Sequence, residues 1–235
     1  MKYISDPSQE TLVGLCVASV IEAISSAWSE RRPAHIVITG GRTGLSVARS
    51  IDSHLFALLR GNSVFEGSML HIWFSDERFT AFDDVLRNDS TLISGFGLCK
   101  SHIVFHRVSE PGDLDEATIK YASEIDVELE GRPFDAVILS VGEDGHVASL
   151  FPGSVDSQDA NSAVAVRESP KPPAQRISIS LPRLSNSKNI YVFACGESKS
   201  EALATIDVGP VGLLDKISSA GQLNILTDLQ IPGVE

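Results

Sequence analysis

The stretch Phe134–Gly153, FDAVILSVGEDGHVASLFPG, decides the predicted fold. Its first part, Phe134 to Ser140, is almost purely apolar and rich in β-branched residues, which is typical of a strand buried on both faces of a parallel sheet. The chain then changes abruptly to glycine and charge, in the order Gly142, Glu143, Asp144, Gly145 and His146. Open α/β sheets bind ligands at the carboxyl ends of such strands. The stretch therefore predicts a ligand-binding turn, with a solvated loop capped at Asp144 as the simpler alternative.

Segments on both sides of this stretch alternate between helix and strand patterns. Helices are expected over Ser8–Glu30, Leu45–Arg60 and Asp113–Glu130, the last with an acidic outer face. Further strands are expected over Ala34–Thr39, Met69–Ser75, Ser101–His106, Arg176–Leu181, Asn189–Cys195 and Leu223–Asp228. This alternation predicts an α/β fold with a single-domain doubly wound, mostly parallel sheet flanked by helices, as in Rossmann-like proteins.

Length and composition limit the domain count and the partners. The chain has 235 residues, is 43% hydrophobic and 21% charged, and shows no shift in composition, so we expect one domain over residues 1–235. The formal net charge of -12 argues against nucleic acid and anionic membranes as partners. It does not exclude an anionic small molecule, because a local cluster of cations outweighs the screened field of distant charges.

The cysteines and the N-terminus favour a soluble cytoplasmic protein. Cys16, Cys99 and Cys195 are widely spaced, which is more typical of buried thiols in a reducing compartment than of disulfides or a zinc site. The N-terminus lacks an apolar core behind a basic start, and no uninterrupted apolar run approaches the roughly 18 residues that span a bilayer.

Glycine and cationic residues follow several of the other predicted strands. GGRTG, residues 40–44, joins a strand to a helix, where backbone N–H groups face an anion, unless the glycines merely form a connecting turn. It matches neither G-x-x-x-x-G-K nor G-x-G-x-x-G, so a nucleotide is not expected. The segment SDERF places Asp76 and Arg78 at a strand end, where a surface ion pair is the alternative. Asn88 is predicted to cap a helix.

Two more cationic segments lie in the second half of the chain. Lys171 and Arg176 flank a proline pair, and Lys199 follows a strand in GESK. Solvated surface positions are the alternative for all three side chains.

Together these segments resemble the 6-phosphogluconolactonases, which share a superfamily with the glucosamine-6-phosphate deaminases. VGEDGHVASLFPG resembles the lactonase signature, and GGRTG, SDERF, KPPAQRISISLPRL and GESK resemble further motifs in the expected order. The resemblance implies a glucosamine-6-phosphate deaminase-like fold and hydrolysis of 6-phosphoglucono-1,5-lactone to 6-phosphogluconate in the oxidative pentose phosphate pathway. It implies no cofactor, and we expect a monomer or weak homodimer.

The resemblance and the residue chemistry together assign a candidate site. His146 is the expected catalytic base, because histidine titrates nearest neutral pH and lactone hydrolysis needs an activated water. Asp144 is expected to orient it, with Asp76 as an alternative. Substrate and phosphate contacts are expected from Gly41, Arg42, Thr43, Asp76, Arg78, Asn88, Lys171, Arg176 and Lys199. A metal is not expected, because E-D-G-H lacks the paired histidines of a zinc helix.

Two other functions remain as alternatives. Glucosamine-6-phosphate deaminases share the glycine loop and D-G-H but continue into F-N-E-P, whereas Ala148–Pro152 here contains no carboxylate. A non-catalytic sugar-phosphate sensor would have no need for His146 and would normally carry a DNA-binding domain. The chain also departs from the lactonase pattern, with Thr80 and Ala81 after D-E-R and no L-P-A-S string in its C-terminal part.

Overall fold

The computed structural model describes residues 1–61, 65, 67–152, 161–205 and 222–230. The strands are β1 (Lys2–Ser5), β2 (Ala34–Ile38), β3 (Leu70–Phe74), β4 (Asp76–Arg78), β5 (Ile103–His106), β6 (Ala136–Ser140), β7 (Ala163–Val166), β8 (Arg176–Ile179), β9 (Asn189–Phe193) and β10 (Gln222–Thr227). The helices are α1 (Gln9–Ser29), α2 (Gly41–Gly61), α3 (Asn88–Ile93), α4 (Leu114–Leu129), α5 (Leu181–Ser185) and α6 (Ser200–Thr205), with short 3₁₀ turns η2 (Lys100–His102) and η4 (Glu197–Lys199). Most of the divergent C-terminal stretch, residues 206–221, lies outside the described residues.

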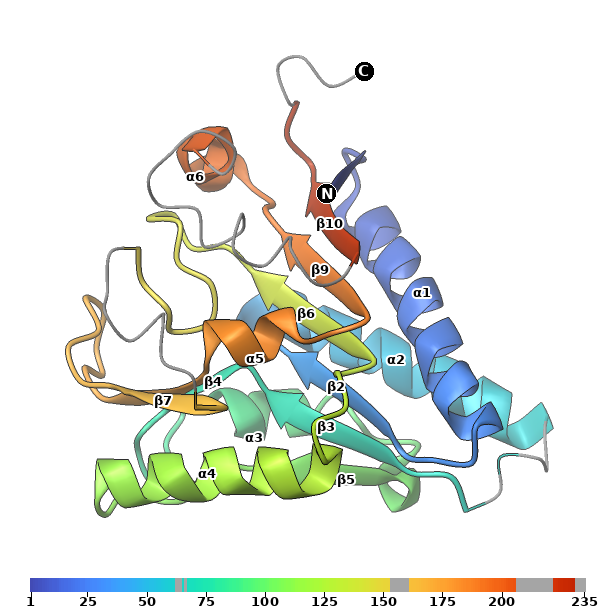
Figure 1. The fold of residues 1–235 in the computed structure, drawn as a ribbon. Coiled ribbons are helices and arrows are strands. Elements are labelled where there is room, and N and C mark those ends of the chain that lie inside the picture. Colours follow the sequence, from blue (N-terminus) through green and yellow to red (C-terminus); the bar gives the residue numbers. More distant parts are fainter. Residues whose placement is uncertain (62–64, 66, 153–160, 206–221, 231–235) are drawn as a thin grey trace.

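Within the described residues, seven strands form one parallel sheet in the order β1-β10-β9-β6-β2-β3-β5 (Figure 1). The chain runs outward from β2 to β3 and β5, then returns to the other side of β2 with β6 and continues to β9 and β10. This reversal makes the β2–β6 junction a topological switch point, where doubly wound sheets bind ligands. The predicted doubly wound parallel sheet is therefore confirmed.

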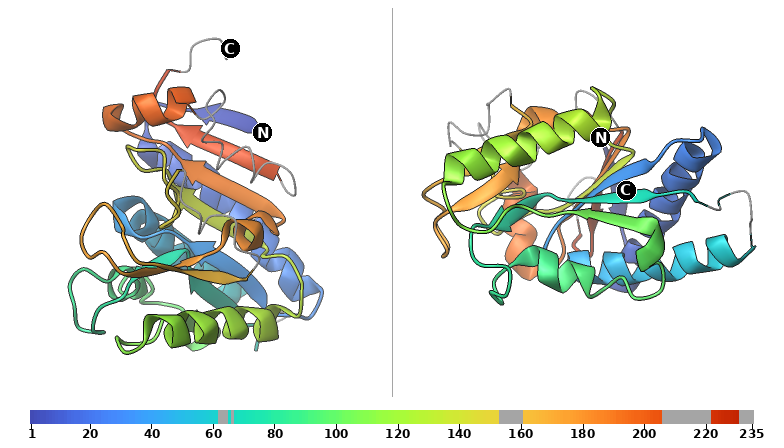
Figure 2. Two further views of the ribbon diagram at one scale, coloured as in Figure 1. Left: turned by 60° about the vertical axis from the view of Figure 1, so that its left-hand side comes forward. Right: turned by 90° about the horizontal axis from the view of Figure 1, so that it is seen from below.

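Alternating side chains of the central strands supply two separate cores. On β2, Val37 packs into one core, whereas Ile36 and Ile38 pack into the other. All three are fully buried, as expected for a parallel strand that is covered on both faces. Helices α1 and α2 cover one face and α4 covers the other, as Figure 2 shows from below.

The sequence prediction missed two parts of the architecture. Strand β1 adds a seventh strand beside β10, and β4, β8 and β7 form a small antiparallel sheet. Both depend on pairing between segments far apart in the chain, which local patterns do not reveal. Helix α2 also begins at Gly41 rather than Leu45, so the predicted glycine loop is largely the first helical turn.

Helix α1 alone among the described helices is long and apolar enough, by length and composition, to span a membrane. Here one face of the helix, including Leu12, Val17 and Ile24, is fully buried in the core beneath the sheet. Packing of this face against the sheet therefore accounts for the apolar character of α1.

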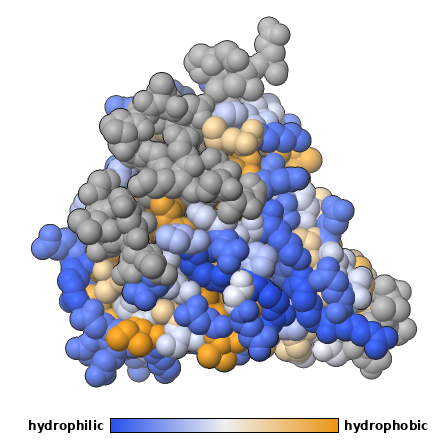
Figure 3. Space-filling view, viewed as in Figure 1, coloured by the Kyte–Doolittle hydropathy of each residue, from blue (hydrophilic) through white to orange (hydrophobic). Residues whose placement is uncertain are grey.

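Helix α4 carries the predicted acidic outer face, with exposed carboxylates at Asp115, Glu116 and Asp126. Two exposed apolar residues interrupt it, Ile119 at 65% and Val127 at 72% exposure. In Figure 3 the surface over α4 accordingly shows small, separate hydrophobic patches on a mostly hydrophilic face. Single apolar side chains of this kind are normal on a soluble surface.

A buried cluster of histidines lies between the sheet and α4. The Trp73 ring stacks on His106 with centroids 3.6 Å apart, and its Nε1 donates to His35 Nδ1 over 3.3 Å. His35 is 2% exposed, and its Nε2 has no hydrogen-bond partner within the described part of the chain. Burial, and next the neighbouring His71, lower the pKa of His35 to about 3. His35 is therefore held neutral in the folded protein.

This depressed pKa predicts a pH effect on stability. An unfolded histidine titrates near 6.5, so the unfolded chain binds the proton first, and His35 costs stability as the pH falls from about 6.5 towards 3. A His35→Gln variant should lose this contribution, making the pH dependence shallower by up to about 1.4 kcal/mol per pH unit. Urea unfolding between pH 5 and 8 measures the slope. The exposed histidine in His54→Gln serves as the control, and a wild-type slope in His35→Gln would contradict the prediction.

Candidate active site

The turn after β6 holds His146 against Asp144. The imidazole Nδ1 hydrogen-bonds to Asp144 Oδ1, and the Phe151 ring lies 4.9 Å from the imidazole, centroid to centroid. Partial burial opposes ionisation of Asp144, but the hydrogen bond and charge of His146 outweigh it and lower the Asp144 pKa. Of the two acids considered from sequence, Asp144 contacts His146, whereas the Asp76 carboxylate contacts serines.

Gly142 makes this arrangement possible. Its backbone N–H donates to the His146 carbonyl over 2.7 Å, so the turn folds back closely on itself. A Cβ at Gly142 would lie only 2.1 Å from His146 Nδ1 and 2.7 Å from Asp144 Oδ1. Glycine is required here because any side chain would occupy the space of the imidazole.

The acids of the SDERF segment are buried rather than paired at the surface. Asp76 is 6% exposed and Glu77 is 0% exposed, so the alternative of a surface ion pair is wrong for both. The Glu77 carboxylate accepts the backbone N–H groups of Asn88 and Asp89, each over 2.8 Å. Burial above all raises the pKa of Glu77, with Asp89 adding to it.

The predicted N-cap role of Asn88 is wrong. Helix α3 begins at Asn88 itself, and the cap position is Arg87, whose side chain makes no cap hydrogen bond. The carboxylate of Glu77, from a different strand, accepts the N–H groups that an N-cap side chain would otherwise accept. This frees the Asn88 side chain, whose Nδ2 donates to the Asp76 carbonyl over 3.2 Å.

Asn88 also joins the SDERF segment to the glycine loop. A Cβ placed on Gly40 would lie 2.1 Å from Asn88 Oδ1, so the amide packs directly on the backbone at the end of β2. The ends of β2 and β3 are thereby tied together.

Ser149 is a site residue that the sequence analysis did not single out. Its Oγ donates to Asp76 Oδ2 over 2.6 Å and accepts from Arg176 Nη1 over 3.4 Å. In the sequence, Ser149 is notable only as part of Ala148–Pro152, the segment that lacks the carboxylate of the deaminase F-N-E-P string. No local signal points to the contact, because Asp76 lies 73 residues away in the sequence.

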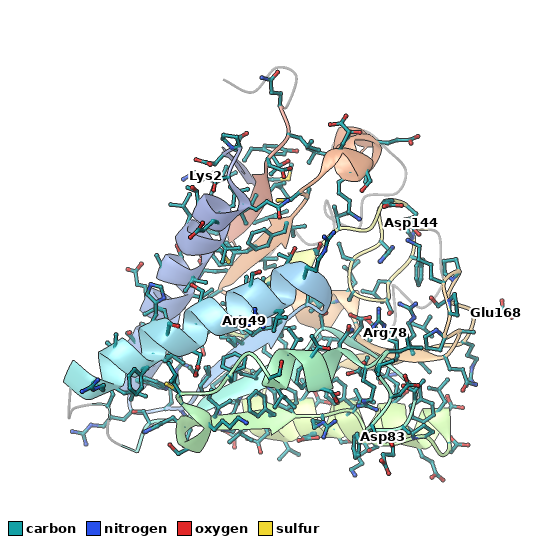
Figure 4. All side chains as sticks on the ribbon, turned by 180° about the vertical axis from the view of Figure 1, so that it is seen from behind. Lys2, Arg49, Arg78, Asp83, Asp144 and Glu168 are labelled. Atoms are coloured by element: carbon teal, nitrogen blue, oxygen red, sulfur yellow. The ribbon has the colours of Figure 1, made fainter. Side chains whose placement is uncertain are left out.

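Two of the predicted cations lie side by side on neighbouring strands of the small sheet. Arg78 on β4 is the direct register partner of Arg176 on β8. Like charges in opposite positions destabilise a strand pair, so an anion bound between them would be stabilising. Arg78 Nε is buried without a hydrogen-bond partner in the described ranges. Figure 4 shows Arg78 and Asp144 on the same side of the molecule, where the strands end.

The other predicted contacts lie in or near a neighbouring cleft of about 1070 Å3. Gly41, Arg42, Thr43 and Lys199 line it, and it continues along α2 towards His54. The predicted residues thus form two groups, one in this cleft and one around His146 and Arg176. Lys171 is exposed and contributes its carbonyl, which accepts from Arg176 Nη2 over 2.8 Å.

Comparison with known proteins identifies the family. The model of the glucosamine-6-phosphate isomerases/6-phosphogluconolactonase family matches residues 7–212. The chain belongs to this family. It is 30% identical over 210 residues to a 6-phosphogluconolactonase of Mycobacterium tuberculosis, covering 84% of this chain and 82% of that protein. A 6-phosphogluconolactonase of Streptomyces coelicolor is 30% identical over 213 residues, covering 83% and 78%.

Solved structures of both family branches share this fold. The 6-phosphogluconolactonase from Trypanosoma cruzi has a TM-score of 0.79 at 21% identity, covering 96% of this chain and 93% of that chain. A monomeric glucosamine-6-phosphate deaminase has a TM-score of 0.73 at 18% identity, covering 97% of each chain. Within this family the fold alone therefore does not separate lactone hydrolysis from deamination.

Gly142 offers a test of the site geometry. Gly142→Ala should force the His146 imidazole away from Asp144, because the added methyl group needs the same space. We expect kcat to fall by about 100-fold or more, because His146, the candidate general base, would no longer be held by Asp144. Steady-state kinetics measure this fall, and Gly112→Ala, at an exposed position with no atom within 4 Å of the added Cβ, is the matched control. Full activity of Gly142→Ala would show that the observed pairing is not needed.

Proposed function

We propose that this chain hydrolyses 6-phosphoglucono-1,5-lactone to 6-phosphogluconate, the lactonase step of the oxidative pentose phosphate pathway, with residues 1–235 forming one sugar-phosphate lactonase domain. The observation that carries the proposal is the His146–Asp144 pair at the switch-point end of β6. The loop that follows, Val147–Phe151, offers serine and apolar residues and no carboxylate for sugar-ring opening. The lactonase names of the 30% identical relatives support the same choice.

The proposed reaction begins with a water activated by His146. Because Nδ1 pairs with Asp144, Nε2 is the nitrogen left to take a proton from water as it attacks the lactone carbonyl carbon. Asp144 fixes the tautomer and stabilises the imidazolium that forms. The Phe151 ring beside the imidazole restricts its rotation.

The tetrahedral intermediate then opens. The carbonyl oxygen bears the negative charge and needs hydrogen-bond donors that are already in place, for which backbone N–H groups of the glycine-rich turns are candidates. As the bond between the carbonyl carbon and the ring oxygen breaks, His146 returns its proton to the ring oxygen. The product is the open-chain acid, and the imidazole is neutral again.

The substrate phosphate would bind to the cations beside this turn. Arg78 and Arg176 stand opposite each other, and an arginine fork matches phosphate oxygens in geometry and charge. Burial lowers the pKa of Arg176, with the charge of Asp76 opposing the shift. Arg42, Thr43 and Lys199 in the neighbouring cleft would extend the anion site.

The proposed chemistry uses no cofactor and no metal, because a lactone is an activated ester that water and a base can open. We also propose that the protein acts as a monomer or weak homodimer. The three cysteines are free thiols, which supports a cytoplasmic location.

The decisive assay uses freshly generated 6-phosphoglucono-1,5-lactone with a chelator present. We expect rapid, metal-independent hydrolysis of this substrate and little acceleration for unphosphorylated gluconolactone, because the phosphate provides the binding energy. Glucosamine 6-phosphate turnover is measured in parallel. Hydrolysis at the spontaneous rate would overturn the lactonase proposal, with ammonia release then favouring deamination and binding without turnover favouring a sensor.

Two substitutions separate chemistry from binding. His146→Ala should lower kcat by about 100- to 10,000-fold with a small change in KM, as expected for loss of a general base. Arg176→Ala should chiefly raise KM, by about 10- to 100-fold, because a charged hydrogen bond to phosphate contributes about 1.5–3 kcal/mol. His102→Ala, outside the cleft, and Arg31→Ala, at an exposed position, are the matched controls. Unchanged kcat in His146→Ala would remove the general-base role.

A further inference from the structure

The hydroxyl of Ser149 lies between a buried carboxylate and a buried guanidinium. It donates to Asp76 Oδ2 over 2.6 Å, and Arg176 Nη1 donates to it over 3.4 Å. Ser149 is 1% exposed, and both partners are 6% exposed. Buried polar groups of this kind keep one arrangement, because an alternative leaves a donor or acceptor without a partner.

The arginine is oriented from three sides. Its Nε donates to the Pro173 carbonyl over 3.2 Å, its Nη2 to the Lys171 carbonyl over 2.8 Å, and its Nη1 to Ser149. A guanidinium has five N–H groups, so these bonds leave two, one on each terminal nitrogen. A pair of N–H groups of this kind suits two oxygens of one phosphate.

We propose that Ser149 is a positioning residue, which holds the Arg176 guanidinium off the Asp76 carboxylate and aimed at the substrate phosphate. Carboxylates only accept hydrogen bonds and guanidinium groups only donate them, so the two side chains would otherwise pair directly. The hydroxyl does both and separates them. The inference deepens the proposed lactonase function and rests on it for the identity of the phosphate.

Ser149 also connects the phosphate end of the site to the reacting end. It follows His146 by three residues, and backbone hydrogen bonds between Val147 and Leu150 in both directions hold the intervening turn. The Ser149 N–H donates to Ser178 Oγ on β8 over 3.4 Å. Ser149 therefore joins the strand that carries Arg176 to the turn that carries His146. This connection fixes the distance between the guanidinium and the imidazole, to which the substrate must conform.

The test compares Ser149→Ala with wild type by calorimetric binding of 6-phosphogluconate and of gluconate. We expect the Kd for 6-phosphogluconate to rise about 10-fold and the KM for the phosphorylated lactone to rise in parallel, with a smaller change in kcat. Gluconate binding should not change, since gluconate lacks the phosphate. Ser187→Ala removes a hydroxyl that is equally buried, at 3% exposure, but donates to the Leu184 carbonyl, so it should behave as wild type.

A double-mutant cycle distinguishes positioning from a merely structural role. If Ser149 acts through Arg176, then Ser149→Ala should have no further effect on 6-phosphogluconate binding in an Arg176→Ala background. If Ser149→Ala does not fold, Ser149→Cys keeps nearly the same volume with a much weaker hydrogen bond and should show the same shift. Wild-type affinity in the single variant, or additive effects in the cycle, would overturn the inference.

The outcomes also separate this inference from the proposed function. A wild-type protein that binds 6-phosphogluconate without hydrolysing the lactone, while the Ser149 variant binds it more weakly, would reject the lactonase activity alone. A wild-type protein that hydrolyses the lactone, with a variant of unchanged affinity, would reject the role of Ser149 alone. A wild-type protein that neither binds nor hydrolyses would reject both.

Discussion

Burial of a parallel sheet on both faces is the constraint on which the rest of the structure depends. Strands covered by helices on both sides must satisfy their backbone hydrogen bonds within the sheet, and each crossover brings the chain back in the same direction. The carboxyl ends of β2, β3, β6 and β9 therefore meet along one edge. Residues separated by more than 100 positions in the sequence, such as Ser75 and Ser178, become neighbours there, and the reversal between β2 and β6 lies beside the candidate site.

Buried charge then fixes the turns at this edge. The Glu77 carboxylate takes the place of a capping side chain for α3, and Asp76 anchors the loop after β6 through Ser149. Arg87 is fully packed beside Asp89, with Nη2 donating to the carboxylate over 2.6 Å. Removing one partner of such a buried pair typically costs about 3–5 kcal/mol, so the surrounding turns have little freedom to rearrange. This rigidity is what a preorganised site requires.

A solved lactonase and a solved deaminase share the architecture of this chain. The two structures cover 96% and 97% of this chain, so the architecture by itself does not decide the chemistry. After the D-G-H that both share, Ala148–Pro152 in this chain includes Ser149 but no carboxylate, whereas the deaminases continue into F-N-E-P. In this chain that serine is used to connect the turn to Arg176.

Local sequence patterns determined six of the seven described strands of the parallel sheet, all but β1, and the long helices α1, α2 and α4, because apolar runs and amphipathic spacing reflect burial directly. Phe134–Ser140 predicted β6, and Ser8–Glu30 predicted α1 almost to the residue. The motifs likewise named Asp144 and Asp76 as candidate partners of His146, and the structure shows that Asp144 makes the contact.

Only the tertiary structure decided which distant groups meet. The edge strand β1, the antiparallel sheet β4-β8-β7, the capping of α3 by Glu77 and the contact of Ser149 with Asp76 all join segments far apart in the chain. A serine or a glutamate has the same local pattern whether it is exposed or buried against a distant partner. Its role follows from desolvation and hydrogen bonding after the chain has folded, and these are properties of the packed molecule.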